Sequence, residues 1–182
     1  VALRNGAGGG GVATLTVPRP TEEGTARMID RRCWMLTGLA MVAASPLAAQ
    51  GGPLLEVWRD PNCGCCSGWV AHMRASGFTV RETVLPALGP VRRMLGTPAD
   101  LLSCHAARVG NLVLEGHVPA LAIRRALADR PSGMLGLAVP AMPVGAPGME
   151  VPGQPDEIYD VIAFDTAGRH ASYMRFRGRE PA

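Results

Sequence analysis

Residues 54–76 read LLEVWRDPNCGCCSGWVAHMRAS, and this stretch decides the fold. It begins with a buried-strand pattern at 54–58, continues through a turn at 60–62, and ends in a helix pattern at 67–76. Three thiols, Cys63, Cys65 and Cys66, lie where the strand pattern gives way to the helix pattern. Free N–H groups and the positive end of the helix dipole favour thiolate there. Because thiolate is both a nucleophile and a ligand for soft metals, the stretch predicts a redox or metal site.

The remainder of the chain predicts a mixed α/β domain. The expected elements, in chain order, are a strand at 54–58, a helix at 67–76, a strand at 78–85, a helix at 91–95, a helical turn at 98–102, a strand at 108–114, a helix at 120–128 and a terminal hairpin of strands at 159–164 and 171–176. Crossover connections imply parallel pairing and the hairpin implies antiparallel pairing, so we expect a mixed central sheet flanked by helices. A strand, a Cys motif and a helix in succession form the thioredoxin-like arrangement. In that arrangement the loop with Cys104 and His105 lies beside the Cys motif.

The segment 131–155 is dominated by Pro and Gly. It contains eleven of them, so we expect no regular element there. Such length without structure indicates function or mobility. The segment carries Met142 and Met149, whose thioethers either bind Cu(I) or fill apolar gaps.

The number and spacing of the thiols favour a metal site. A disulfide exchanger needs two thiols, and a third beside them would interfere with exchange. Clustered thiolates suit Cu(I), and Cys104 with His105 offers a fourth thiolate and an imidazole. A structural disulfide to Cys104 remains an alternative. A zinc site of three Cys and His105 is another, although three thiols within four residues are poorly spaced for it. His117, just before the helix at 120–128, is interpreted as a capping or buried structural residue.

The first 49 residues are expected to include an export signal and to lie outside the folded domain. Residues 1–27 are Gly-rich and are interpreted as an extension outside the native domain. Residues 28–49 hold an Arg pair, an apolar run and small residues ending at Ala49, as in a secretory signal of the Sec or twin-arginine type. Cleavage after Ala49 would leave residues 50–182 as a periplasmic domain without a stable membrane span.

Composition argues against several function classes. All 18 basic residues are Arg, the formal net charge is +3, and no long basic run occurs. Nucleic-acid binding is therefore not predicted. A nucleotide-binding loop, a zinc-protease motif and a paired-carboxylate signature are also absent from the sequence.

Several motifs, in order, resemble one known family. They are PNCGCC at 61–66, SCH at 103–105, EGHVP at 115–119, GLAVP at 136–140, MP at 142–143 and PGME at 147–150. Together they cover about residues 54–177 and resemble the CopG-like periplasmic copper-resistance proteins, a former domain of unknown function with a Cys-x-Cys-Cys motif. The resemblance implies a thioredoxin-like fold and copper handled between Cu(I) and Cu(II). The ligands it implies are Cys63, Cys65, Cys66 and Cys104, with Met149 or His105 as further ligands.

The family resemblance makes an exported copper-binding protein the leading hypothesis, acting as a copper oxidoreductase or carrier in copper resistance. Its partners would be copper ions and other envelope copper-handling proteins. A thiol–disulfide oxidoreductase of the cell envelope is the alternative. A disulfide-stapled interaction module is a third hypothesis.

Overall fold

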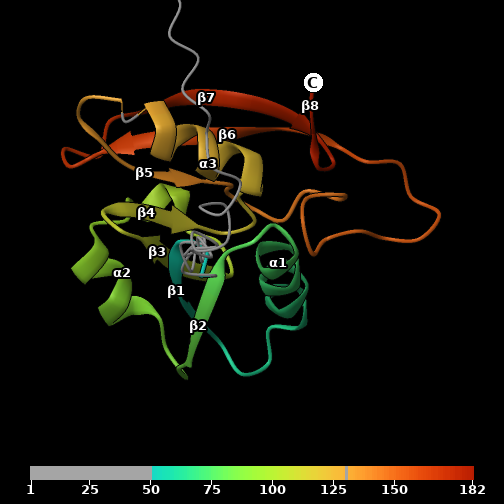
Figure 1. Cartoon of the computed structure of the whole chain (residues 1–182), viewed down its shortest axis with the longest axis horizontal. Helices are drawn as coiled ribbons and strands as arrows, with labels where there is room; N and C mark the ends of the chain where they lie inside the picture. Colours follow the sequence, from blue (N-terminus) through green and yellow to red (C-terminus); the bar gives the residue numbers. More distant parts are fainter. Residues whose placement is uncertain (1–50, 130) are drawn as a thin grey trace, which may run out of the picture. The chain divides into compact units, whose positions relative to one another are not determined.

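The structure, a computed structural model, describes residues 51–129 and 131–182. The expected extension at 1–27 and the expected signal peptide at 28–49 lie outside the described residues. The described chain forms β1 (Leu54–Arg59), α1 (Gly64–Ala75), β2 (Thr79–Val84), α2 (Gly89–Leu95), a 3-10 helix (Ala99–Leu101), β3 (His105–Val109), β4 (Leu112–Glu115), α3 (Ala120–Asp129), β5 (Met134–Ala138), β6 (Ile158–Asp165), β7 (His170–Arg177) and β8 (Glu180–Pro181) (Figure 1). Within these ranges, none of the helices has the length and apolarity to cross a membrane.

One open sheet of eight strands organises these elements, in the order β2-β1-β3-β4-β5-β6-β7-β8. The pairs β1–β2 and β4–β5 are parallel, and the other neighbours are antiparallel. A crossover helix joins each parallel pair, α1 for the first and α3 for the second, as parallel pairing requires. The predicted mixed α/β sheet with flanking helices and a C-terminal hairpin is confirmed.

Helix α1 follows directly from the cysteine-rich stretch. Its buried residues are Cys66, Trp69, Val70 and Met73, the spacing of one helical face. The helix ends at Ala75 with Ser76 as its C-cap, and Gly77 follows with a φ of +84°, a conformation that glycine adopts at little cost. The packed face of α1 therefore includes one of the motif cysteines, which fixes the motif to the core.

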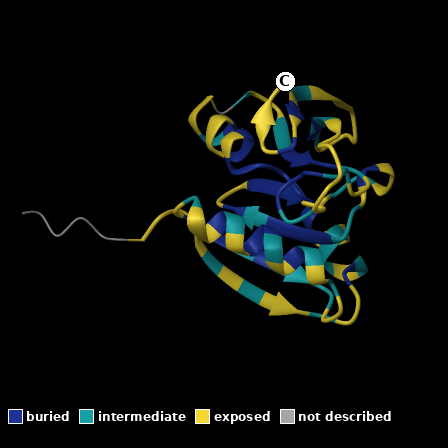
Figure 2. Cartoon of the chain, turned by 90° about the vertical axis from the view of Figure 1, so that its right-hand side faces the viewer, coloured by how far each residue is buried: buried dark blue, intermediate teal, exposed yellow. Residues whose placement is uncertain are grey.

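The sheet separates two cores. Helices α1 and α3 cover one face, where Trp69 and Ile123 pack with Val57 and Leu114. Helix α2 covers the other face, where Leu95 packs with Ala106, Val113 and Phe164. Figure 2 colours the central strands as buried, whereas β2, the edge strand beside β1, alternates between intermediate and exposed residues. Because neighbouring strand residues point to opposite faces, successive residues such as Ala106 and Ala107 belong to different cores.

Three sequence-based expectations are corrected. The predicted strand at 108–114 is two antiparallel strands, β3 and β4, joined at Gly110 and Asn111, where Gly110 has a φ of +57°. The segment at 131–155 is not wholly irregular, since it contains β5. Helix α1 begins at Gly64 rather than at residue 67, so two motif cysteines lie within its first turn.

Candidate metal centre

The register of the sheet brings two distant segments of the chain together. Strands β1 and β3 pair antiparallel, with Arg59 opposite His105. The Cys motif follows the end of β1 and Cys104 precedes the start of β3. Because these two strands are antiparallel, both segments lie at the same end of the strand pair. The Sγ atoms of Cys63, Cys65, Cys66 and Cys104 all lie within 4.8 Å of one another. Pairing of β1 with β3 therefore assembles four sulfur atoms from residues separated by up to 41 positions.

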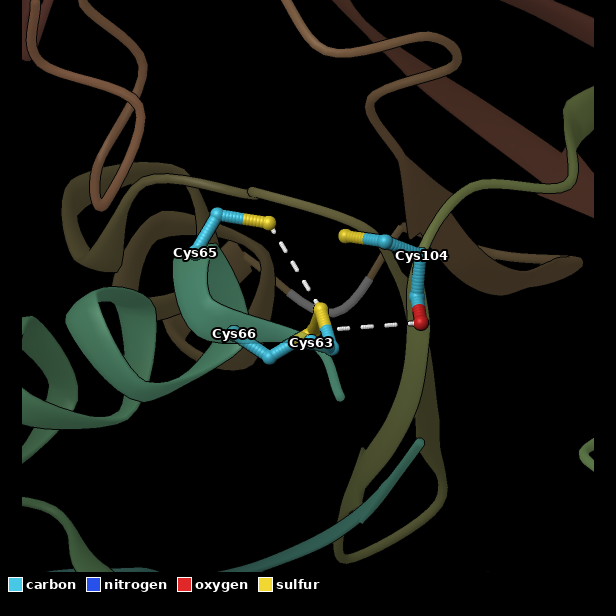
Figure 3. A group of neighbouring side chains, drawn as sticks. All are labelled: Cys63, Cys65, Cys66 and Cys104. Carbon is cyan, nitrogen blue, oxygen red and sulfur yellow. Dashed lines mark hydrogen bonds between the residues drawn. A yellow bond between two sulfur atoms is a disulfide. The ribbon is translucent and has the colours of Figure 1, made fainter. Parts of the chain in front are cut away.

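Two of these sulfurs are joined and two are free. Cys63 and Cys66 form a disulfide, with their Cα atoms 5.4 Å apart. Cys65 and Cys104 are free thiols. In Figure 3 their sulfur atoms point toward each other, and the Cys65 Sγ lies 3.5 Å from that of Cys63. The disulfide thus forms within the motif and not to Cys104. Because thiolates rather than disulfide sulfurs bind metal ions, all four sulfurs could serve as ligands only when this disulfide is reduced.

Cys104 also contacts two buried imidazoles. Its Sγ lies 2.9 Å from Nε2 of His117 and 3.3 Å from Nδ1 of His105. Both histidines are fully buried. His117 donates its Nδ1–H to the Pro147 carbonyl over 2.7 Å, which leaves Nε2 as an acceptor for the Cys104 thiol.

Burial keeps this group of side chains neutral. Burial is the main cause that raises the pKa of Cys104 to about 12, and the charge of a Cys65 thiolate adds to it. Desolvation likewise lowers the pKa of His117 and lowers that of His105 well below its ordinary value. The resting pair is therefore a neutral thiol and a neutral imidazole. A metal ion that displaces the thiol proton would supply the charge that the pocket itself does not favour.

A buried ion pair holds the strand ends that carry Cys104 and His117. Glu115, the last residue of β4, is fully buried and lies 2.6 Å from the Arg92 guanidinium of α2. The Ser103 amide donates to the Glu115 carboxylate over 2.8 Å, and Arg92 donates to the Ser103 carbonyl. Desolvation raises the pKa of Glu115, while Arg92 opposes this shift. The ion pair thus fixes the residue before Cys104 to the strand that leads to His117.

The segment after β5 returns across the site. The Ser103 hydroxyl donates to the Ala141 carbonyl over 2.9 Å. Further along, Gly148 lies so close to α1 that a Cβ there would be 2.4 Å from the Trp69 nitrogen and 2.6 Å from the Cys65 carbonyl oxygen. Met149, half-buried, is the next residue, so the backbone of this segment lies beside the cysteine motif. Met142 is 53% exposed.

Sequence reasoning assigned no ligand role to His117, and the fold explains why. With 108–114 taken as one strand, Cys104 and His117 fall at opposite ends of it. The β3–β4 hairpin instead returns the chain to its starting point, and the Gly116 amide donates to the His105 carbonyl. The Gly110-Asn111 dipeptide could have predicted the β3–β4 hairpin, because such dipeptides are typical of two-residue hairpin turns.

The chain is similar to one described protein family and to two solved structures. The family model described as "Protein of unknown function, DUF411" matches residues 101–149. A solved structure of copper resistance protein CopG, Form 1, is 36% identical, covers 70% of this chain and 100% of that chain, and has a TM-score of 0.64. The chain belongs to the CopG copper-resistance family. Form 2 of CopG is 35% identical, with coverage of 68% and 98% and a TM-score of 0.63. Among curated proteins, none matches the chain.

The CopG family membership and the cysteine cluster together support a function connected with copper. The residues matched by the family model include Cys104, His105, His117 and Met149, whereas the Cys motif lies before them. This set of four sulfur atoms could hold a copper ion, because sulfur donors within 4.8 Å of one another suit a soft metal.

Proposed function

We propose that this CopG-family chain is an exported protein that binds Cu(I) through Cys63, Cys65, Cys66 and Cys104. The observation that carries the proposal is the convergence of four Sγ atoms within 4.8 Å. Thiolate is the protein ligand best suited to Cu(I). Met149 and His105 are proposed as further ligands, because the first lies beside the Gly148 contact with α1 and the second contacts Cys104.

The proposed fold is thioredoxin-like. The supporting feature is the half-sheet β2-β1-β3-β4, in which the β1–β2 pair is parallel and the β1–β3 and β3–β4 pairs are antiparallel. The Cys motif lies between β1 and α1, with Cys63 as the N-cap of the helix and no acidic residue in its first turn. The helix dipole therefore favours thiolate at Cys63 when the disulfide is open.

The motif also has the means to change the oxidation state of copper. In the proposed step the thiolates of Cys63 and Cys66 each give one electron to one Cu(II) ion and join as a disulfide. Two Cu(II) ions become two Cu(I) ions, so the electrons balance. A dithiol reductant would restore the thiols. The protein would then act in copper resistance as a copper oxidoreductase or a carrier of Cu(I), and other envelope copper-handling proteins would receive the ion.

The proposed cellular setting follows the N-terminal sequence. Residues 28–49 would direct export through the Sec or twin-arginine route, and the domain at 50–182 would act in the periplasm. Residues 1–27 would lie outside the functional protein. Mass spectrometry of the protein from the periplasmic fraction tests this, since a mature N-terminus at Gln50 is the expected result.

One observation favours a second function. The Cys63–Cys66 disulfide is a Cys-x-x-Cys pair at a helix N-terminus, the arrangement of thiol–disulfide oxidoreductases. Insulin reduction with and without copper distinguishes the two functions. Turnover that copper leaves unchanged would favour thiol exchange, whereas turnover that copper abolishes would favour copper binding.

The primary test is a Cu(I) titration of the reduced full chain, without oxygen, against a competing chelator. Copper per chain and reactive thiols are counted together. We expect tight copper binding with simultaneous loss of thiol reactivity, because the same sulfur atoms would bind copper and react with the reagent. Replacing Cys63 with Ser removes a proposed ligand and should weaken binding at least tenfold, while Cys33→Ser, in the expected signal peptide, should not. Unchanged affinity in Cys63→Ser would refute the ligand assignment.

A further inference from the structure

We infer that His72 is a pH-sensitive latch between helices α1 and α3. As a neutral imidazole it holds the first backbone N–H group of α3, and as an imidazolium it releases that group and turns toward Glu150. The inference goes beyond the proposed copper function and does not depend on it, because the latch would operate in the metal-free protein.

A side chain of α1 supplies a cap for the start of α3. The amide of Ala120, the first residue of α3, donates to Nε2 of His72 over 3.3 Å. The first N–H groups of a helix have no partner within the helix, and the first turn of α3 contains no acidic residue. Nε2 can accept this hydrogen bond only while it carries no proton. Protonation of His72 therefore removes the acceptor that the Ala120 amide uses.

The latch lies beside the candidate metal centre. Helix α1 begins within the Cys motif, and His117 precedes α3 by only a few residues. A second hydrogen bond joins the same two segments, because Nε1 of Trp69 donates to the Val118 carbonyl over 2.9 Å. Loss of the Ala120 contact would leave the indole to hold the turn before α3. Mild acid would thus loosen the attachment of this turn to α1.

The surroundings of His72 favour its neutral form. Desolvation is the main cause that lowers its pKa below the ordinary 6.5, the charge of Arg179 adds to this, and the charge of Glu150 opposes it. From α3, the positive end of the helix dipole faces the imidazole, while Arg124 reaches the Ser76 carbonyl at the end of α1. A latched imidazole consequently binds a proton more weakly than a released one. Proton binding must therefore shift the population toward the released state.

Glu150 gives the released imidazolium a partner. Its Oε2 accepts the Gly148 amide over 2.9 Å, and its Oε1 lies 3.8 Å from Nε of Arg179. The Glu150 carboxylate favours the charged form of His72 and would compete for it with these two donors. The proton thus exchanges a contact between α1 and α3 for one between α1 and the loop at 148–150. Two alternative partners for one side chain make a two-state element.

The test is nuclear magnetic resonance of the full, metal-free chain with the Cys63–Cys66 disulfide closed, between pH 8 and pH 5. We expect the His72 ring to titrate below pH 6.5. The Ala120 amide proton should move to lower frequency with the same midpoint, because it loses its hydrogen bond. Its protection against hydrogen exchange, corrected for the intrinsic rate, should fall by up to about tenfold per pH unit below that midpoint.

Variants assign the effect to His72. His72→Gln keeps an oxygen acceptor that does not titrate, so the Ala120 amide should no longer respond to pH. Glu150→Gln keeps an acceptor for the Gly148 amide but removes the charge, so the His72 midpoint should move to lower pH. His170→Gln, at an exposed position on β7, is the matched control and should change neither result.

Two outcomes would overturn the latch. One is a His72 titration that leaves the Ala120 amide unmoved. The other is a pH response of Ala120 that persists in His72→Gln, because another group, such as His117, would then cause it. If His72→Gln does not fold, unequal midpoints for His72 and Ala120 in the unmodified protein would overturn the latch, and equal midpoints would support it.

Discussion

Cys104 is the residue on which the chemistry of the site depends. Its sulfur has a second cysteine on one side, Cys65, and a buried imidazole on the other, that of His117. Burial holds its pKa near 12, so the uncomplexed thiol is protonated at neutral pH. Cys104 is therefore a poor nucleophile in the metal-free fold.

The buried histidines should make the folded state sensitive to mild acid. Desolvation lowers the pKa values of His105 and His117 in the folded state below the ordinary value of 6.5. Below pH 6.5 the unfolded chain therefore binds more protons than the folded chain. These histidines do not reduce the free energy of unfolding above pH 6.5, and they lower it progressively as the pH drops below that value. Urea unfolding of the metal-free protein at pH 7.5 and 5.5 should show a lower free energy of unfolding at 5.5. The slope should not exceed about 1.4 kcal/mol per pH unit for each histidine.

Glu115 acts in the opposite direction, because desolvation raises its pKa and the folded state therefore binds its proton before the unfolded chain does; other ion-paired carboxylates act at lower pH. Arg59 and Arg175 lower the pKa values of Glu82 and Asp160, so the contribution of these carboxylates is lost only at pH values below the histidine window. His105→Gln should reduce the pH dependence, whereas the exposed His170→Gln should not. Equal stability of the unmodified protein at the two pH values would contradict the prediction.

The sequence predicted which cysteines belong to the site better than it predicted which side chains contact one another there. The thiols at 63, 65 and 66 and the Cys104-His105 pair are recognisable from their chemistry and spacing alone. The prediction that His117 has a capping or buried structural role agrees with its full burial, but its contacts with Pro147 and Cys104 come from the tertiary fold and no local pattern shows them. The pairing within the motif was likewise open, since four cysteines allow three connectivities.

At the scale of elements, the site depends on the close approach of the loop before Glu150 to helix α1. Gly148 has a φ of +84° and no room for a Cβ, which would lie 2.4 Å from the Trp69 backbone nitrogen. Pro147, which accepts the His117 hydrogen bond, is its neighbour. Displacing Gly148 therefore displaces the acceptor that orients His117.

Replacement of Gly148 with Ala should destabilise the protein and loosen the site. The left-handed backbone costs about 1–2 kcal/mol for Ala, and the clash with α1 adds to it. Gly153 is a matched control, because its φ is +80° but nothing lies within 4 Å of a Cβ there. Urea unfolding should show the larger loss for Gly148→Ala, and alkylation of Cys104 should be faster in that variant alone. Equal losses in the two variants would show that the close contact contributes nothing.

Elements with strong periodicity were predictable, and those defined by long-range pairing were not. The spacing of Trp69, Val70 and Met73 predicts α1 because the buried face lies within one helix. Strand β5 escaped prediction because its partners, β4 and β6, supply the pairing that Gly136 and its Pro-rich surroundings do not suggest. Gly136 is required there, since a Cβ would lie 2.4 Å from the Phe164 ring.

At the scale of the described domain, both cores are built on one sheet and should unfold together. Phe176 belongs to the core under α1 and α3, and Leu101 belongs to the core beside α2. Phe176→Ala should cost about 3–5 kcal/mol and Leu101→Ala about 2–5 kcal/mol. Val84→Ala, on the exposed edge strand, is the control and should change little.

Two probes measure whether the cores are coupled. In a background with Trp34→Phe and Trp58→Phe, tryptophan fluorescence reports on buried Trp69 and far-ultraviolet circular dichroism on all elements. The two denaturation curves should coincide in every variant, because strands β1, β3 and β4 contribute to both cores. Separation of the curves in Leu101→Ala would show that the α2 side unfolds independently.

The short separation between the two disulfide partners bears on the order of events during folding. Cys63 and Cys66 are three positions apart, whereas Cys104 is 38 positions beyond Cys66. A short loop closes with a small loss of chain entropy, while Cys104 arrives only after β3 has paired with β1. An oxidised nascent chain would therefore close the local pair before Cys104 is near. Closure of the local pair would protect Cys104, the most distant in sequence of the four clustered cysteines, from mispairing, and Cys104 would enter the finished protein as a free thiol.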